Sequence, residues 1–209
     1  MTRSNLKWAR GLGIAGICGA VSIVLTDVIG ILVRPGYNPI FQSVSELAIG
    51  PTGWIQDVGM FLGAAGTVAC AAGLYLVLDE GWHLRLGEFL LLVAGLGLLL
   101  AAVFKTDVAP PKTAGGIIHD TASLVAGIAF VPVCFLISPA LRPRRALFAY
   151  TIAAGILGAG LEIGTGRFPE HWVLFGLHER LFLANAVAWV LIISWVVLLR
   201  YRESQPPPA

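Results

Sequence analysis

Long apolar stretches alternate with short polar segments along this chain. Six stretches reach the ~20 residues that a helix needs to cross the hydrocarbon core of a bilayer. They lie near residues 9–33, 55–78, 86–104, 117–138, 146–165 and 181–199. Open strands cannot cross lipid with unpaired backbone groups, and the alternating pattern of a barrel is absent, so these stretches predict helices. We therefore expect an all-α fold, a polytopic transmembrane bundle of six helices within 1–202, followed by a disordered tail at 203–209.

The composition supports a membrane protein. The chain is 57% hydrophobic and only 12% charged, whereas a soluble domain carries roughly 25% charged residues. The net charge of +2 includes no basic block, so membrane lipids and no nucleic acid are the expected partners. Cys18, Cys70 and Cys134 fall inside apolar runs without metal-ligand spacing, so we interpret them as packing residues.

The distribution of basic residues predicts the orientation, because cytoplasmic loops are enriched in lysine and arginine. With both termini cytoplasmic, nine basic residues lie inside and five outside. The inner set is Arg3, Lys7, Arg10, Arg85, Arg142, Arg144, Arg145, Arg200 and Arg202. The outer set is Arg34, Lys105, Lys112, Arg167 and Arg180. The short inner loops then act as connectors, and the longer outer segments 34–54, 105–116 and 166–180 are the expected place for function.

Ionisable residues gather at the outer ends of the predicted helices, where each is costly in lipid. They are Asp27, Asp57, His119, Asp120, Glu162, Glu179 and Arg180. As a set on one side, they predict a wet, polar cavity open to the outside. Taken singly, each can instead cap its own helix or extend to the interface.

The first outer loop contains two features. The dipeptides Pro35-Gly36 and Asn38-Pro39 are turn signals on either side of Tyr37. Ser43 and Glu46 have the spacing of a capping box, which predicts a short interfacial helix. In the functional alternative, Ser45 or Glu46 lines the cavity. No Gly-x-Ser-x-Gly motif supports a serine nucleophile here.

The other two outer segments supply histidines and further charges. Asp107 is close enough in sequence to orient the His119 imidazole for proton transfer or metal ligation. His171 and His178 share a face only if their segment is helical. We expect Glu179 and Arg180 to form an ion pair where the last helix begins.

Three groups of residues resemble the domain-of-unknown-function 998 family of integral membrane proteins. They are Tyr37-Asn38-Pro39 with Ser45-Glu46-Leu47, then Phe104-x-Thr106-Asp107 with Thr113-x-x-Gly116-x-x-His119, and finally Glu179-Arg180. Their order and the helix layout extend the resemblance over nearly the whole chain. The resemblance implies a six-helix bacterial membrane protein without an assigned activity, which agrees with a multi-pass plasma-membrane location.

Three functions remain open. The first is an enzyme acting on a lipid or isoprenoid-like substrate at the outer leaflet, with His119, Asp107, Glu46 and Ser45 as catalytic residues. Arg180 would clamp a charge. The other candidate binding residues are Asp27, Tyr37, Asn38, Asp57, Glu162, His178 and Glu179.

The metal and cofactor of such an enzyme stay unassigned. A metal held by His119, His171 and His178 lacks the familiar His-Glu-x-x-His spacing.

The second function is a proton-coupled transporter with Asp27 and Glu162 as the relay. The third is a non-catalytic binding or sensor protein whose outer loops contact a partner.

Overall fold

The computed structural model describes residues 3–78, 81–167 and 174–203, and this part contains helices and no strand. The helices are α1 (Arg3–Val33), α2 (Gly53–Val77), α3 (Trp82–Val103), α4 (Ala114–Ile137), α5 (Arg145–Arg167) and α6 (Phe175–Glu203). Two short 3-10 helices, η1 (Val44–Ala48) and η2 (Ser138–Leu141), lie in connections. All six long helices have the length and hydropathy to cross a membrane. The predicted all-α, six-helix fold is confirmed, and all six helices begin earlier than the apolar runs indicate. Of the tail predicted at 203–209, Glu203 is the last residue of α6 and the rest lies outside the described residues.

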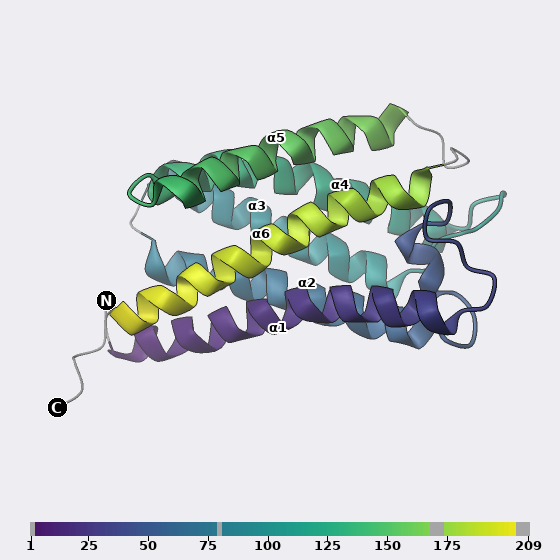
Figure 1. Ribbon diagram of the computed structural model, residues 1–209, viewed down its shortest axis with the longest axis horizontal. Coiled ribbons are helices and arrows are strands. Elements are labelled where there is room, and N and C mark those ends of the chain that lie inside the picture. Colours follow the sequence, from purple (N-terminus) through teal and green to yellow (C-terminus); the bar gives the residue numbers. More distant parts are fainter. Residues whose placement is uncertain (1–2, 79–80, 168–173, 204–209) are drawn as a thin grey trace.

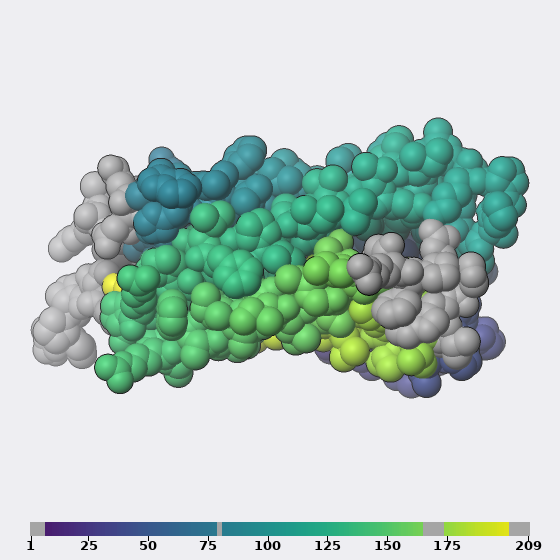
Figure 2. Space-filling model, turned by 90° about the horizontal axis from the view of Figure 1, so that it is seen from above, coloured from purple at the N-terminus to yellow at the C-terminus, as the bar shows by residue number. Residues whose placement is uncertain are grey.

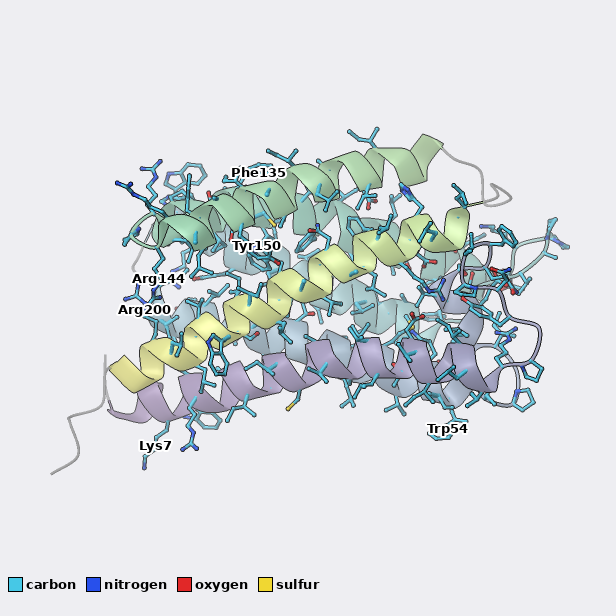
Figure 3. All side chains as sticks on the ribbon, in the orientation of Figure 1. Lys7, Trp54, Phe135, Arg144, Tyr150 and Arg200 are labelled. Atoms are coloured by element: carbon cyan, nitrogen blue, oxygen red, sulfur yellow. The ribbon has the colours of Figure 1, made fainter. Side chains whose placement is uncertain are left out.

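The helices form a closed ring of neighbours. Each packs against the next in sequence, α1 also packs against α6, and α2 reaches α6 across the ring. The first residues of α1 and the last residues of α6 lie at the same end of the bundle, which we call the terminal end (Figure 1). The bundle is elongated in both views (Figure 2). The long connections 34–52 and 104–113 lie at the opposite, long-loop end. Lys7, Arg144 and Arg200 lie toward the terminal end and Trp54 toward the long-loop end (Figure 3).

The terminal half of the bundle has a filled core. Trp189 of α6 is fully buried, and its ring meets Phe130 of α4 edge-on at 5.7 Å between centroids. Large side chains from three helices continue this core toward the termini. They are Leu74, Val133, Ile137, Ile193 and Val197. These buried side chains therefore pack closely around Trp189 in the terminal half.

Small residues bring α1 and α2 into backbone contact. A Cβ atom on Gly66 of α2 would lie 2.8 Å from the Cα of Gly19 on α1, and a Cβ on Gly19 would lie 2.5 Å from the Leu62 carbonyl oxygen. Helices in lipid associate through such close packing, since burial of apolar surface supplies little drive there. The glycines therefore fix α1, which leads into the first long loop.

We expect Gly66→Ala to lower the melting temperature of the detergent-purified protein. The added methyl group would force the two backbones apart, at about 1–3 kcal/mol for overpacking. Gly11→Ala on the same pair of helices is the control, because nothing lies within 4 Å of a Cβ at Gly11. An equal loss of stability in both variants would contradict the described contact between α1 and α2.

Candidate functional site

A cavity of about 420 Å³ lies between the helices in the long-loop half. This is within the range of roughly 300–1,000 Å³ that small-molecule sites occupy. Its polar lining consists of Ser43, Ser45, Glu46, Gln56, Thr67, Thr106, Asp107, His119, Asp120, Ser123, Glu162 and Glu179. Its apolar lining includes Leu91, Leu98, Phe130, Phe182, Val187 and Val190. The prediction that polar residues at this end face a common cavity therefore holds for part of the set.

The cavity extends well into the membrane-spanning region. On α4 the lining residues run from His119 to Phe130, which at 1.5 Å per residue is about 16 Å along the helix axis. On α2 they run from Gln56 to Thr67, a similar depth. About half of a ~30 Å hydrocarbon core is covered in this way. The space thus has a polar end near the loops and an apolar end near the middle of the bundle.

His119 and Ser45 form a hydrogen-bonded pair in this cavity. The distance from His119 Nε2 to Ser45 Oγ is 2.9 Å. His119 Nδ1 lies 2.8 Å from the Ala101 carbonyl oxygen and 2.9 Å from that of Phe104, where α3 ends. Since carbonyl oxygens only accept, Nδ1 carries the hydrogen and Nε2 of the neutral ring accepts from the serine hydroxyl. A hydrogen bond of this kind can link a serine nucleophile to its base.

Short-range structure around η1 holds Ser45 in place. Ser43 Oγ accepts from the Glu46 backbone N–H at 3.2 Å, and Glu46 Oε1 accepts from the Ser43 N–H at 3.1 Å, which confirms the predicted capping box. Val44 and Leu47 are buried on either side of Ser45. Glu46 both caps the turn and lines the cavity, so the two interpretations of this residue are compatible.

Asp107 has a different role from the predicted one. Its Oδ2 accepts from the Thr113 backbone N–H at 2.6 Å and from Thr113 Oγ1 at 3.0 Å. Thr113 in turn caps α4 by accepting from the Gly116 N–H. Within the described residues, the imidazole of His119 is oriented by two carbonyl groups instead. The prediction that Asp107 orients His119 is wrong, because Asp107 is held by the first residues of α4.

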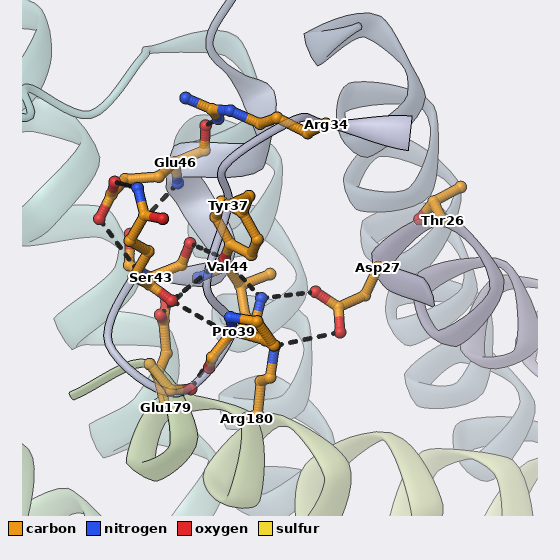
Figure 4. A network of polar contacts seen from close by, with 12 residues as sticks. Thr26, Asp27, Arg34, Tyr37, Pro39, Ser43, Val44, Glu46, Glu179 and Arg180 are labelled. Carbon is orange, nitrogen blue, oxygen red and sulfur yellow. Dashed lines mark hydrogen bonds and ion pairs between the residues drawn. The ribbon is translucent and has the colours of Figure 1, made fainter. Parts of the chain in front are cut away.

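Arg180 connects α6, α1 and the first long loop (Figure 4). Its guanidinium contacts both carboxylate oxygens of Asp27, with Nη2–Oδ1 at 3.0 Å and Nε–Oδ2 at 3.2 Å. Its Nη1 donates to the carbonyl oxygens of Pro39 at 2.8 Å and Gln42 at 2.9 Å. The arginine therefore fixes the path of the loop that continues into η1.

The expected ion pair between Glu179 and Arg180 is also wrong. Glu179 Oε2 accepts from the Val44 backbone N–H at 2.7 Å, whereas Arg180 pairs with Asp27. Neighbouring residues on a helix point in different directions, so these two side chains reach different partners. Glu179 holds η1 from the cavity side, and Arg180 holds the preceding loop.

Tyr37 and Asn38 shape the same loop. The Tyr37 hydroxyl accepts from Arg180 Nη2 at 2.6 Å and donates to the Ser43 carbonyl at 2.6 Å. Burial raises the pKa of Tyr37 to about 12, so the hydroxyl keeps its proton at neutral pH. Asn38 Oδ1 accepts from the Ile40 N–H at 3.0 Å. Both residues support the loop, and neither is among the residues that line the cavity.

Three further predicted residues lie outside the cavity lining or the described chain. Asp57 forms an ion pair with Lys105. His178 Nε2 lies 2.7 Å from the Leu161 carbonyl oxygen, a contact between α6 and α5. His171 falls outside the described residues, and within the described ranges no group of three histidine, cysteine or acidic side chains is placed to hold a metal ion. The three-histidine metal hypothesis therefore has no support from the geometry.

Gln56 is a cavity residue that the sequence did not single out. Its side chain is only 1% exposed, and neither amide atom has a partner among the described residues. Such a buried amide costs about 1–3 kcal/mol when it is unsatisfied. The sequence does contain an indication of this residue, because Gln56 is a lone amide one turn into an apolar helix and is adjacent to Asp57.

Comparison with known proteins assigns a family but no activity. The family model described as "Protein of unknown function (DUF998)" matches residues 17–196. No curated protein matches the chain, and no solved structure matches it either. The match covers all six helices at least in part, including the residues around the cavity.

Proposed function

Since the chain belongs to the DUF998 family of proteins of unknown function, we propose from its cavity alone that it is a membrane-embedded enzyme that hydrolyses or transfers the acyl group of a lipid-like ester. Ser45 is the nucleophile and His119 is the base. The carrying observation is the 2.9 Å contact between Ser45 Oγ and His119 Nε2 inside the cavity.

The proposed reaction uses the tautomer that the hydrogen bonds define. Ser45 Oγ attacks the acyl carbonyl carbon while His119 Nε2 accepts the hydroxyl proton. The C–O bond to the leaving alcohol then breaks, and His119 returns the proton to the alcohol oxygen. Water next attacks the acyl-serine, gives a proton to Nε2 and releases the carboxylic acid as Ser45 regains its hydrogen.

Two backbone carbonyls take the place that a carboxylate holds in many serine enzymes. The Ala101 and Phe104 oxygens accept from Nδ1–H, so they orient the ring and stabilise the imidazolium formed during the reaction. Their partial negative charges are fixed by the end of α3. No carboxylate next to His119 is required.

The shape of the cavity favours a lipid-like substrate. An acyl chain fits the apolar end near Phe130 and Val190, and its ester group then lies at the depth of the polar residues. The distribution of lysine and arginine supports placing the long-loop end outside the cytoplasm. We therefore propose that the enzyme acts in the outer leaflet of a bacterial plasma membrane.

The transporter and the sensor receive less support. Asp27, one member of the relay considered above, is bound by Arg180 and is not among the cavity-lining residues. Large apolar side chains, among them Ile137 and Ile193, make up most of the buried core of the terminal half. A binding or sensor role explains the cavity but gives no reason for the Ser45–His119 pair.

The test is covalent labelling by an alkyl fluorophosphonate, which reacts with activated serines. We expect one adduct on Ser45, identified by peptide mass spectrometry of the purified protein. Ser45→Ala should abolish it, and His119→Ala should slow it by about 100-fold or more through loss of the base. Ser22→Ala is the control, since Ser22 bonds to the Gly19 carbonyl within α1. Absence of labelling at Ser45 in the folded wild type would overturn the proposal.

A further inference from the structure

Carboxyl groups dominate the charge of the cavity. Five acidic side chains line it, and no lysine or arginine does so within the described residues. The five are Glu46, Asp107, Asp120, Glu162 and Glu179. Lys112 pairs with Asp120 from outside the lining, and hydrogen bonds hold three of the others. The cavity therefore offers carboxyl groups, and no lysine or arginine from the described residues, to an occupant.

Glu162 differs from the other four. Its half-buried carboxylate on α5 has no hydrogen bond or ion pair to the described part of the chain. It lies against Gly127 of α4, where a Cβ atom would be only 2.4 Å from Glu162 Oε2. A glycine at this point leaves the space that the carboxylate fills. An acidic side chain without a counter-ion in a membrane-spanning helix marks a functional position.

Gln56 gives an independent indication of a ligand. It lines the same cavity from α2, is 1% exposed, and leaves both its amide nitrogen and its amide oxygen without a partner among the described side chains and backbone. An amide offers one donor group and one acceptor and carries no charge. It fits a polar group that both donates and accepts, at the loop-side end of the cavity where α2 begins.

We propose that the cavity selects single-chain amphiphiles whose headgroup carries a protonated amine. The ammonium pairs with Glu162, Gln56 bonds to the neighbouring polar linkage, and the chain occupies the apolar end. This inference rests on the proposed function and names the substrate class of the same site. Phosphate, sulfate and carboxylate headgroups are disfavoured, since like charges repel more strongly in a desolvated site.

Binding is measured on the Ser45→Ala protein, in which no turnover occurs. The probes are dodecylamine, dodecanol and dodecyl sulfate, which share one chain length and differ in headgroup charge. Native mass spectrometry in a neutral maltoside detergent at pH 7 gives the relative affinities. We expect dodecylamine to bind about tenfold or more tightly than dodecanol, consistent with one desolvated ion pair, and dodecyl sulfate to bind most weakly.

Three variants test how individual residues contribute to binding. Glu162→Gln should bring dodecylamine to the level of dodecanol, whereas Asp57→Asn should keep the preference, since Asp57 pairs with Lys105 away from the cavity lining. Gln56→Met should leave the preference for dodecylamine over dodecanol unchanged, because these probes lack the polar linkage, and should raise the melting temperature of the ligand-free protein by removing an unsatisfied amide.

The outcomes separate this inference from the proposed reaction. Equal or tighter binding of dodecyl sulfate, or an unchanged amine preference in a folded Glu162→Gln protein, would overturn the amine site. Failure of Ser45 to react with the fluorophosphonate, together with a preserved amine preference, would remove the reaction and leave the amine site supported. If Ser45 is labelled but the protein shows no preference for the amine, the proposed reaction is supported and the amine site is overturned.

Discussion

His119→Gln is expected to lower kcat for hydrolysis of a chromogenic dodecanoyl ester by about 10³-fold, within the usual range for loss of a general base. A glutamine amide can still donate to the Ala101 and Phe104 carbonyls, so local packing is largely kept. It cannot accept and return the serine proton, however. Because the chain of the substrate binds elsewhere in the cavity, KM should change little, and the effect should fall on kcat.

His178→Gln is the matched control for this variant. His178 likewise lies at the long-loop end, where it is half-buried, but it bonds to the Leu161 carbonyl between α6 and α5. It should keep most of the wild-type kcat. An equal loss of kcat in both variants, or full activity in a folded His119→Gln protein, would show that the imidazole of His119 takes no part in proton transfer.

The six helices could be predicted because one physical constraint acts on each segment separately. A helix must bury about 20 residues of apolar surface in lipid to cross the bilayer, and that requirement can be read from each run alone. The capping box of Ser43 and Glu46 was equally accessible, since both of its hydrogen bonds span three residues. Local chemistry specifies both features.

The site residues required contacts between distant segments. Ser45 and His119 are 74 positions apart, and no local sequence motif predicts that they form a hydrogen bond. Asp107 was assigned to His119 because the two are close in sequence, yet Thr113 is closer and offers both a backbone and a side-chain donor. Gln56 was missed for a related reason, since burial without a partner is visible only when the neighbouring helices are in place.

The second large effect is expected for Arg180→Met. Removing the guanidinium leaves Asp27 mostly buried and unpaired, a change that typically costs about 3–5 kcal/mol. The carbonyl groups of Pro39 and Gln42 lose a donor at the same time. We expect a large drop in melting temperature and a loss of fluorophosphonate labelling at Ser45, because the loop that positions η1 is released. Arg142→Met, an exposed cation in the connection at the terminal end, should change neither quantity.

A second variant separates stability from positioning. Asp27→Leu combined with Arg180→Met removes both charges, and replacing a buried ion pair by apolar side chains is often nearly neutral for stability. The melting temperature should therefore recover in part. Labelling of Ser45 should not recover, because Tyr37 and the loop carbonyls still lack the arginine that holds them. If labelling returned with stability, the network around Arg180 would serve the fold alone, and the position of Ser45 would be set by η1 and Glu179.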